Sequence, residues 1–352
     1  MFSSFNDLIP IMNTKKLIAN LISDLNPRQK EFLEERFGLV DNQKKTLQEL
    51  GDRYEITRER VRQIEAEGLK FVAAKFAESE GVKFVEKAIK HLETIGGIKE
   101  EGAFVNELKT LWDDNTLSNS ETRFMFAVAK KPLYYVDDDN FYSFWYSDKD
   151  TFKKADSFIS KASKFFAAKK EDLVSKNKFS ELLGQLTKAS GIKELFATNY
   201  LAVSKKFGMN PYNDFGLSHW EEITPKTARA KAYLVLKKHG KPLHFKEIAD
   251  MINKVGFSKK QVYAQTIHNE LIKDSKFVLV GRGIYALKEH GYAPGTAKEV
   301  IQKVLKENGP LHPQQILELV SQQRFLKENT ILLNLQNKKH FKKLSDGRYH
   351  TA

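Results

Sequence analysis

Four polar side chains on one side of a predicted helix have the chemistry needed to read base edges in duplex DNA. They belong to Arg58, Glu59, Arg62 and Gln63. Arginine pairs with guanine, glutamine pairs with adenine, and a carboxylate accepts the amino group of cytosine. A solvated helix face with mixed charges carries the same residue types, so the spacing alone leaves both interpretations open.

The helix that carries these residues is predicted to be the second of a helix-turn-helix pair. Its opposite side is apolar at helical spacing, with Val61, Ile64, Gly68 and Val72. A shorter helix before it shows the same spacing at Leu47, Leu50 and Tyr54. Thr57 is placed to cap the second helix, because threonine is a preferred N-cap residue. The apolar sides would anchor both helices and leave the polar side of the second exposed.

The sequence of this segment resembles region 4 of the bacterial sigma-70 family of transcription initiation factors. Three motifs carry the resemblance: LNPRQKEFLEERFGL at residues 25–39, TLQELG at 46–51 and TRERVRQIE at 57–65. It extends over about residues 11–75 and implies a module that reads the −35 element of a promoter.

By this resemblance, the base-reading residues are expected to be Arg58, Glu59, Gln63 and, beside them, Arg62. Thr57 and Arg60 are expected to contact the DNA backbone. Two residues depart from the family pattern, because Glu67 and Gly68 stand where the family usually carries Lys and Ala. The added carboxylate weakens attraction to phosphates, and glycine costs about 1 kcal/mol relative to alanine within a helix.

The last third of the chain contains an internal repeat, in which residues 236–287 recur more loosely as residues 305–351. Each copy predicts helices followed by two strands around a tight turn. The turns are Gly281-Arg282-Gly283 and Asp346-Gly347, both of a kind favoured in hairpins. Helices followed by a hairpin are the order of a winged helix, so the repeat predicts two tandem winged helices of about 60 residues each.

The first copy resembles the HARE-HTH family of winged helices. Residues 225–288 carry the resemblance, through GKPLHFKEIA at 240–249 and NELIKDSKFVLVGRGIYAL at 269–287, and residues 294–352 resemble the family more loosely. The family implies a module that docks onto nucleic-acid machinery. Arg282, at the tip of the first hairpin, is expected to contact the DNA backbone.

The middle of the chain predicts further helical units. Residues 82–147 predict three helices and a hairpin, the order of a divergent winged helix. The segment between its two strands carries Asp137, Asp138 and Asp139. These residues predict a turn rather than a metal site, because adjacent carboxylates do not converge on one ion.

Residues 148–222 are predicted to be helical, with a winged helix as the alternative. Their lysine-rich beginning is interpreted as an amphipathic helix whose aromatic residues face a core, with a platform that stacks single-stranded bases as the alternative.

The amino-acid composition limits the classes of function that this protein can have. The 58 basic residues exceed the 45 acidic ones, giving a net charge of +13, which favours polyanionic partners. The absence of cysteine excludes disulfides and thiolate zinc sites. His244 and His312 occupy equivalent repeat positions, but neither has a partner at metal-ligand spacing, so each is interpreted as a local contact at a helix start. No signal peptide, membrane span or catalytic motif is recognised, and we expect no enzyme, cofactor or metal.

The expected fold is mainly α: a sigma-region-4-like helix-turn-helix followed by small winged-helix domains. The expected boundaries are 1–76, 82–147, 148–222, 224–289 and 294–352. The expected function is a transcription regulator, cytoplasmic and nucleoid-associated, whose partners are promoter DNA and the RNA polymerase core and not a membrane or a small molecule. Two alternatives remain: a polymerase accessory subunit, like the delta protein, that reads no sequence, or the DNA-recognition subunit of a restriction or defence system.

Overall fold

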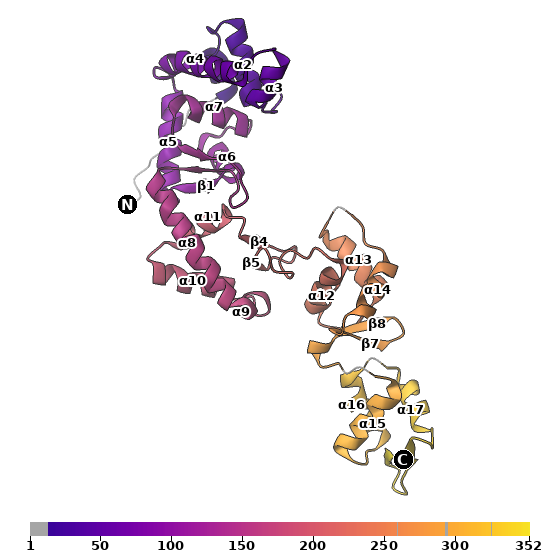
Figure 1. The fold of residues 1–352 in the computed structure, drawn as a ribbon. Helices are drawn as coiled ribbons and strands as arrows, with labels where there is room; N and C mark the ends of the chain where they lie inside the picture. The colour runs from indigo at the N-terminus through magenta and orange to yellow at the C-terminus, as the bar shows by residue number, and fades with distance from the viewer. Residues whose placement is uncertain (1–12, 259, 293–294, 325) are drawn as a thin grey trace. The chain divides into compact units, whose positions relative to one another are not determined.

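The chain forms two compact units, Met1–Phe207 and Gly208–Ala352, both built mainly from helices (Figure 1). The computed structural model describes residues 13–258, 260–292, 295–324 and 326–352. Short strands pair into small antiparallel sheets, so the predicted mainly α fold with winged-helix hairpins is confirmed. Among the described residues, no helix is both long enough and apolar enough to cross a membrane.

The described part of unit 1 starts with four helices, the last two of which are the predicted helix-turn-helix. They are α1 (Thr14–Leu21), α2 (Pro27–Phe37), α3 (Leu47–Arg53) and α4 (Arg58–Phe76). At the start of α2 the Asn26 side chain accepts the backbone N–H of Gln29 at 2.8 Å. The helix ends at Gly38 (φ 68°), where a Cβ would lie 2.9 Å from the backbone of the following turn. Residue type predicts both caps. The apolar residues between 1 and about 22 also predict a leading helix, and the part of it before residue 13 lies outside the described residues.

The next six elements follow the order of a winged helix. They are α5 (Gly81–Thr94), β1 (Ile98–Glu100), α6 (Glu101–Trp112), α7 (Asn119–Ala129), β2 (Leu133–Tyr135) and β3 (Phe144–Tyr146). The strands form one antiparallel sheet in the order β1-β3-β2. The sequence predicts the helices and the hairpin but not β1, because β1 lies directly between two helices and lacks the adjacent turn and partner strand that mark the hairpin.

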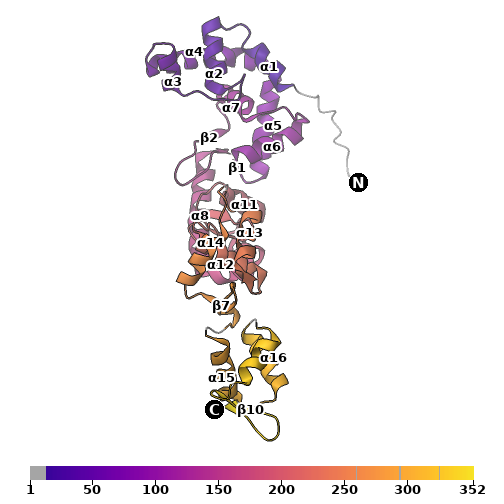
Figure 2. The same ribbon diagram turned by 90° about the vertical axis from the view of Figure 1, so that its right-hand side faces the viewer.

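The helix-turn-helix region and this winged helix share one hydrophobic core. The shared cluster includes Leu33, Val72, Phe124 and Trp145. Helix α7 lies against α1, α2 and α4 (Figures 1 and 2). There the ring of Phe37 meets that of Phe124 edge-on, with the centroids 5.4 Å apart. The helix-turn-helix region that carries α4 is therefore packed against the α5–β3 region through a common core.

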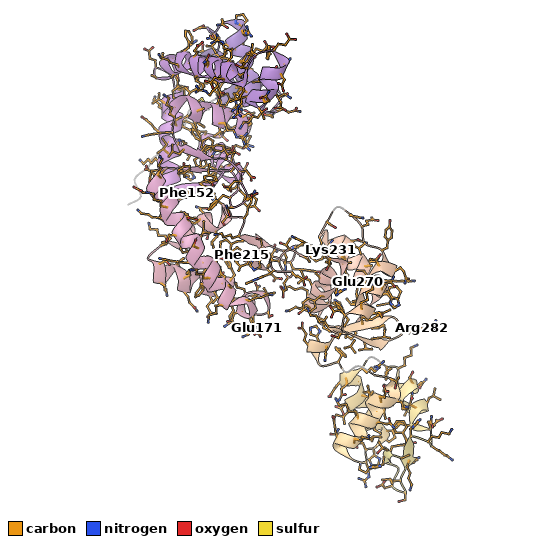
Figure 3. The ribbon with its side chains drawn as sticks, in the orientation of Figure 1. Phe152, Glu171, Phe215, Lys231, Glu270 and Arg282 are labelled. Carbon is orange, nitrogen blue, oxygen red and sulfur yellow. The ribbon has the colours of Figure 1, made fainter. Side chains whose placement is uncertain are left out.

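The remaining helices of unit 1 are α8 (Lys149–Ala168), α9 (Lys170–Val174), α10 (Phe179–Ser190) and α11 (Glu194–Ala202), and the hairpin of β4 (Phe207–Met209) and β5 (Phe215–Leu217) follows them. Phe158 and Phe166 of α8 are buried. Phe152 lies against Tyr135 and Phe144 of the winged-helix sheet, with ring centroids 5.3 and 5.7 Å away (Figure 3). The aromatic residues of α8 face a core, as the amphipathic pattern predicts, and this packing argues against the base-stacking platform.

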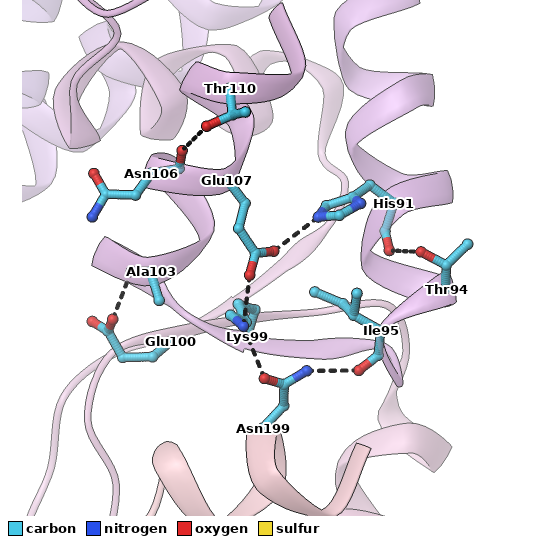
Figure 4. Close-up of polar contacts among 10 residues, drawn as sticks. All are labelled: His91, Thr94, Ile95, Lys99, Glu100, Ala103, Asn106, Glu107, Thr110 and Asn199. Atoms are coloured by element: carbon cyan, nitrogen blue, oxygen red, sulfur yellow. Dashed lines mark hydrogen bonds and ion pairs between the residues drawn. The ribbon is translucent and has the colours of Figure 1, made fainter. Parts of the chain in front are cut away.

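A partly buried polar network joins α5, β1, α6 and α11 (Figure 4). The Glu107 carboxylate lies 2.7 Å from Nζ of Lys99 and 2.8 Å from Nε2 of His91. Lys99 also donates to Oδ1 of Asn199 at 2.9 Å, and the Asn199 amide donates to the carbonyl of Ile95 at 2.8 Å. Because Lys99, Glu107 and the buried Asn199 amide all have partners, the network can hold α11 against the sheet without the cost of an unsatisfied buried amide.

Unit 2 contains two copies of one order of elements. The first copy comprises α12 (Ala228–His239), β6 (Leu243–His244), α13 (Phe245–Val255), α14 (Ala264–Lys273), β7 (Phe277–Gly281), β8 (Ile284–Leu287) and the 3₁₀ turn Lys288–His290. The second copy comprises α15 (Ala297–Asn308), α16 (Pro313–Gln323), α17 (Glu328–Leu335), β9 (Phe341–Lys343) and β10 (Tyr349–Thr351). Each copy buries its own apolar cluster. The backbone of Leu311 bridges to Tyr349, at the place that β6 takes in the first copy. The residue types of Thr224 and Pro225 predict that these two residues cap α12. This prediction is wrong, because Thr227 caps the helix, accepting the N–H of Ala230 at 3.1 Å.

Candidate nucleic-acid interface

The turn between α3 and α4 is held by local hydrogen bonds and one close approach. A capping box starts α3, in which Oγ1 of Thr46 accepts the Glu49 N–H at 3.1 Å and the Thr46 N–H donates back to the Glu49 carboxylate at 2.6 Å. The backbone of Ile56 donates to the carbonyl of Gly51 at 2.9 Å. A Cβ on Gly51 would lie 2.8 Å from the Ile56 carbonyl oxygen, so this turn requires glycine in α3.

Thr57 caps α4 as the sequence predicts. Its Oγ1 accepts the backbone N–H of Arg60 at 3.2 Å. A hydroxyl can accept and donate at the same time, so the Thr57 hydroxyl can still donate to a phosphate at the N-terminus of α4. The N-terminal end of a helix also carries partial positive charge, which favours such an anion.

Helix α4 has one buried and one exposed side. The buried residues are Val61, Ile64, Gly68, Val72 and Phe76. The first two pack with Phe32 and Leu50, and a Cβ on Gly68 would lie 3.2 Å from Cδ1 of Leu33. The departure from the family pattern at Gly68 therefore coincides with a close contact between α2 and α4. The predicted base-reading residues are exposed on the other side: Arg58, Glu59, Arg62 and Gln63.

Two side-chain pairs occupy the exposed side of α4. The Glu59 carboxylate accepts from Arg62 through Nη2 at 2.6 Å and through Nε at 2.9 Å. The hydrogen bond from Arg62 lowers the pKa of Glu59, and the same bond raises the pKa of Arg62. Arg60 donates to Oε1 of Gln63 at 3.1 Å. Among the described residues, the Arg58 side chain has no hydrogen-bond or ion-pair partner, so it is the base-reading candidate that needs no rearrangement.

The inner side of α4 is tied to the preceding segments by Arg36. Its Nε lies 3.1 Å from the Glu65 carboxylate of α4, and its Nη1 donates to the carbonyl of Lys45 at 2.9 Å. Both side chains of this ion pair are mostly buried. The link fixes the rotation of α4 about its axis, which determines the side chains that α4 presents outward.

Arg282 lies in the turn between β7 and β8, at the margin of the first winged helix of unit 2 (Figure 3). Its side chain is exposed. Gly283 (φ 71°) closes the turn, and a Cβ there would lie 2.6 Å from Nε2 of His244. The turn is therefore compact, and it presents the Arg282 guanidinium to solvent at the tip of the wing.

Helix α14, the third helix of that winged unit, supplies candidates that the sequence reasoning missed. Ile267 and Leu271 are buried, while Gln265 and Asn269 are exposed and hydrogen-bonded to each other at 3.1 Å. The spacing of the two buried residues could have identified these polar side chains as outward-facing. Tyr263, just before α14, is 72% exposed.

The residues that suggested metal sites make local contacts. Oδ1 of Asp138 accepts the N–H groups of Asn140 and Phe141 at 2.8 Å each, and its Oδ2 accepts the Tyr135 hydroxyl at 2.7 Å, as expected of a turn. His244 caps α13, accepting the N–H of Lys246 at 3.3 Å. No group of three His, Asp or Glu side chains suited to a metal ion occurs within the described part of the chain.

The comparisons with known proteins agree with this geometry. Residues 21–72 match the family described as Sigma-70, region 4, and residues 226–290 match the HARE-HTH family, whose description includes the restriction endonuclease HTH domain. The chain therefore carries a sigma-70 region 4 domain and a HARE-HTH domain. Both families are helix-turn-helix domains. The HARE-HTH match covers the first copy of the repeat, and the same assignment for the second copy stays a prediction.

The proteins similar to this chain include sigma factors. RNA polymerase sigma factor SigA of Microcystis aeruginosa is 45% identical over 53 residues, which are 15% of this chain and 13% of that protein. RNA polymerase sigma factor SigA of Clostridium acetobutylicum is 43% identical over 56 residues, 16% of this chain and 15% of that protein. The likeness thus concerns a small part of each relative.

Proposed function

We propose that this protein is a DNA-binding transcription regulator that reads a promoter element of the −35 kind through α4 and associates with bacterial RNA polymerase on the nucleoid. One observation carries the proposal: the segment that matches sigma-70 region 4 folds as a helix-turn-helix whose second helix exposes Arg58, Glu59, Arg62 and Gln63 together. These residue types can distinguish base pairs in the major groove. Thr57, Arg60 and Arg282 are proposed to contact phosphates.

The HARE-HTH domain supports the same class of function. A protein with two separate helix-turn-helix modules can combine one sequence-reading contact with others that add affinity. The alternative of an accessory subunit that reads no sequence shares the fold but not the role of α4. A direct test of α4 therefore separates the two functions.

The test compares Arg58→Ala and Gln63→Ala with the unchanged protein on a selected duplex and on a scrambled one. Each substitution should cost about 1–3 kcal/mol on the selected duplex and relax the preference at one base position. Lys83→Ala is the charge-matched control for Arg58→Ala, because Lys83 is an exposed cation on α5. Equal losses on both duplexes would contradict base reading and leave the accessory-subunit alternative.

Association with polymerase needs its own measurement. The protein should capture the polymerase core from a native lysate, and sequencing of the co-purified DNA should return a common motif. Capture of polymerase without a common motif would favour the accessory subunit. Capture of a nuclease instead would favour the restriction or defence alternative.

A further inference from the structure

A lysine-lined groove of about 810 Å³ lies in unit 1, on elements that take no part in the α4 surface. Helix α8 contributes Lys153, Lys154 and Lys161, and the segment before α11 contributes Lys193. All four side chains are exposed. The rest of the wall includes the small residues Gly96, Gly97, Ser147, Ser157, Ser190 and Gly191. We call this feature the α8 groove.

The positive charge of the α8 groove is only partly compensated by acidic side chains. Its acidic lining residues are Glu93 and Asp148. The Asp148 carboxylate is occupied, because it accepts the backbone N–H and the hydroxyl of Thr151, at 2.8 Å each, and the hydroxyl of Ser147 at 2.9 Å. The N–H of Thr151 is the main cause of the lowered pKa of Asp148. Outside the lining, an exposed Asp150 pairs with Lys153 at 3.3 Å. The hydrogen bonds to Asp148 keep it charged, so the four lysines of the lining face two lining carboxylates and an excess of positive charge remains.

The aromatic residues beside the groove are not presented for stacking on bases. Phe158 is buried beneath it, and Tyr200 is buried with its hydroxyl donating to the carbonyl of Gly96 at 3.0 Å. The ring of Phe196 is covered by the ammonium of Lys193, 5.4 Å from its centroid. Stacking platforms need open aromatic faces, so the groove suits phosphates rather than bases.

The composition of this segment points to contacts that do not depend on sequence. Residues 148–207 contain 13 lysines and no arginine, against seven acidic residues. Lysine binds phosphate as a flexible point charge, whereas the rigid fork of arginine is the usual reader of guanine. The α4 surface, by contrast, carries Arg58 and Arg62. The two surfaces therefore have different chemistry.

We propose that the α8 groove is a second DNA-binding site, which holds the phosphate backbone without reading bases. The proposal rests on the proposed function only in that DNA is the polyanion concerned. It separates the molecule into a base-reading surface on α4 and a backbone-holding surface on α8 and the start of α11. Lysine, serine and backbone N–H groups are the usual partners of DNA phosphates.

The test neutralises the groove in the full-length protein with four substitutions: Lys153→Gln, Lys154→Gln, Lys161→Gln and Lys193→Gln. Binding to a selected and a scrambled duplex is measured as salt rises from about 50 to 200 mM, because each lost phosphate contact lowers the slope of log affinity against log salt by about 0.9. The slope should become shallower by about 2 to 4, equally on both duplexes. The preference for the selected duplex should not change.

A matched control removes the same charge elsewhere on the same segment: Lys149→Gln, Lys164→Gln, Lys169→Gln and Lys188→Gln, all exposed and outside the groove lining. The control should change the slope by less than half as much. Equal effects of the two variants would overturn the proposal in favour of net charge. An unchanged slope together with lost polymerase capture would overturn it in favour of an acidic protein surface.

The result distinguishes failure of this proposal from failure of the proposed function. If α4 reads no sequence, Arg58→Ala leaves preference unchanged, yet the groove variant still shows a shallower slope on scrambled DNA. Thermal unfolding of both four-fold variants should match that of the parent, because all the substituted side chains are exposed. Polyglutamate and scrambled DNA can also be compared as competitors of the bound duplex. If polyglutamate displaces the duplex as strongly as scrambled DNA does, the α8 groove is not a site for phosphates.

Discussion

The polar surface of α4 is partly occupied by its own side chains. Glu59 accepts hydrogen bonds from Nε and Nη2 of Arg62, and Gln63 accepts one from Arg60. A base pair must therefore replace contacts that already exist, and only one that offers matched donors and acceptors does so without loss. At the scale of single residues, the pairing makes Glu59 a restraint on Arg62 as well as a candidate base reader.

This restraint predicts a difference between two acidic residues of α4. Glu59→Gln should raise affinity for scrambled DNA and reduce the preference for the selected duplex, because it removes a negative charge and frees Arg62. Glu67→Gln should raise affinity for both duplexes equally, because Glu67 is exposed and has no partner among the described residues. Fluorescence anisotropy with both duplexes measures both effects. An unchanged preference in the Glu59 variant would show that Glu59 neither reads a base nor restrains Arg62.

At the scale of elements, α1 is held by one buried carboxylate. Oδ2 of Asp114 accepts the hydroxyl and N–H of Thr14 at 2.6 and 3.3 Å, and its Oδ1 accepts the hydroxyl and N–H of Thr116 at 2.6 and 2.9 Å. Burial raises the pKa of Asp114, but hydrogen bonds from Thr116 and Thr14 outweigh burial and leave the pKa below 3.8. The charged form of Asp114 therefore docks α1 onto the loop after α6.

Asp114→Asn should lower the free energy of unfolding by about 1–3 kcal/mol at pH 7, because an amide N–H₂ replaces an oxygen that accepts hydrogen bonds. Since folding lowers the pKa, the contribution of Asp114 is complete above the unfolded pKa near 3.9 and is lost as pH falls below it. Urea unfolding at pH 7 and near pH 3 should show that the difference in unfolding free energy between Asp114→Asn and the parent shrinks at the lower pH.

The control is Asp113→Asn, at an exposed neighbouring residue, which should stay within about 0.5 kcal/mol of the parent. A pH-independent difference would contradict the charged contact.

Local signals predicted much of the fold, and contacts between distant segments account for what they missed. The caps at Asn26, Gly38 and Thr57 follow from residue type, and the inward aromatics of α8 follow from helical spacing. Strand β1 was missed, since its partner β3 lies far along the chain. The pairing of Glu59 with Arg62 is a local contact, three residues apart on one helix, and the alternative of a solvated face with mixed charges already allowed it. The packing of Phe37 on Phe124 was also missed, because the two residues are far apart in the sequence and each looks like an ordinary core position.

At the scale of the whole molecule, the base-reading surface and the positive charge lie largely in different units. Residues 208–352 contain 24 Lys and Arg residues against 13 Asp and Glu, whereas residues 1–207 contain 34 against 32. The base-reading candidates lie in unit 1, with the shared core behind α4. Specificity and most of the electrostatic affinity are therefore expected to be separable by truncation, but only at a boundary that leaves the shared core intact.

Two truncations test this separation. A chain ending at residue 207 should keep the ratio of affinities for selected and scrambled duplexes, while its affinity for both falls at least about tenfold and its salt slope becomes shallower. A chain ending at residue 76 should lose cooperative unfolding, because it exposes Leu33, Phe37 and Val72, which pack against α7 and its neighbours. Circular dichroism on heating measures the second effect and serves as the folding control for the first. A stable, sequence-reading fragment 1–76 would contradict the role of the shared core, since α4 would then hold its position without the winged helix behind it.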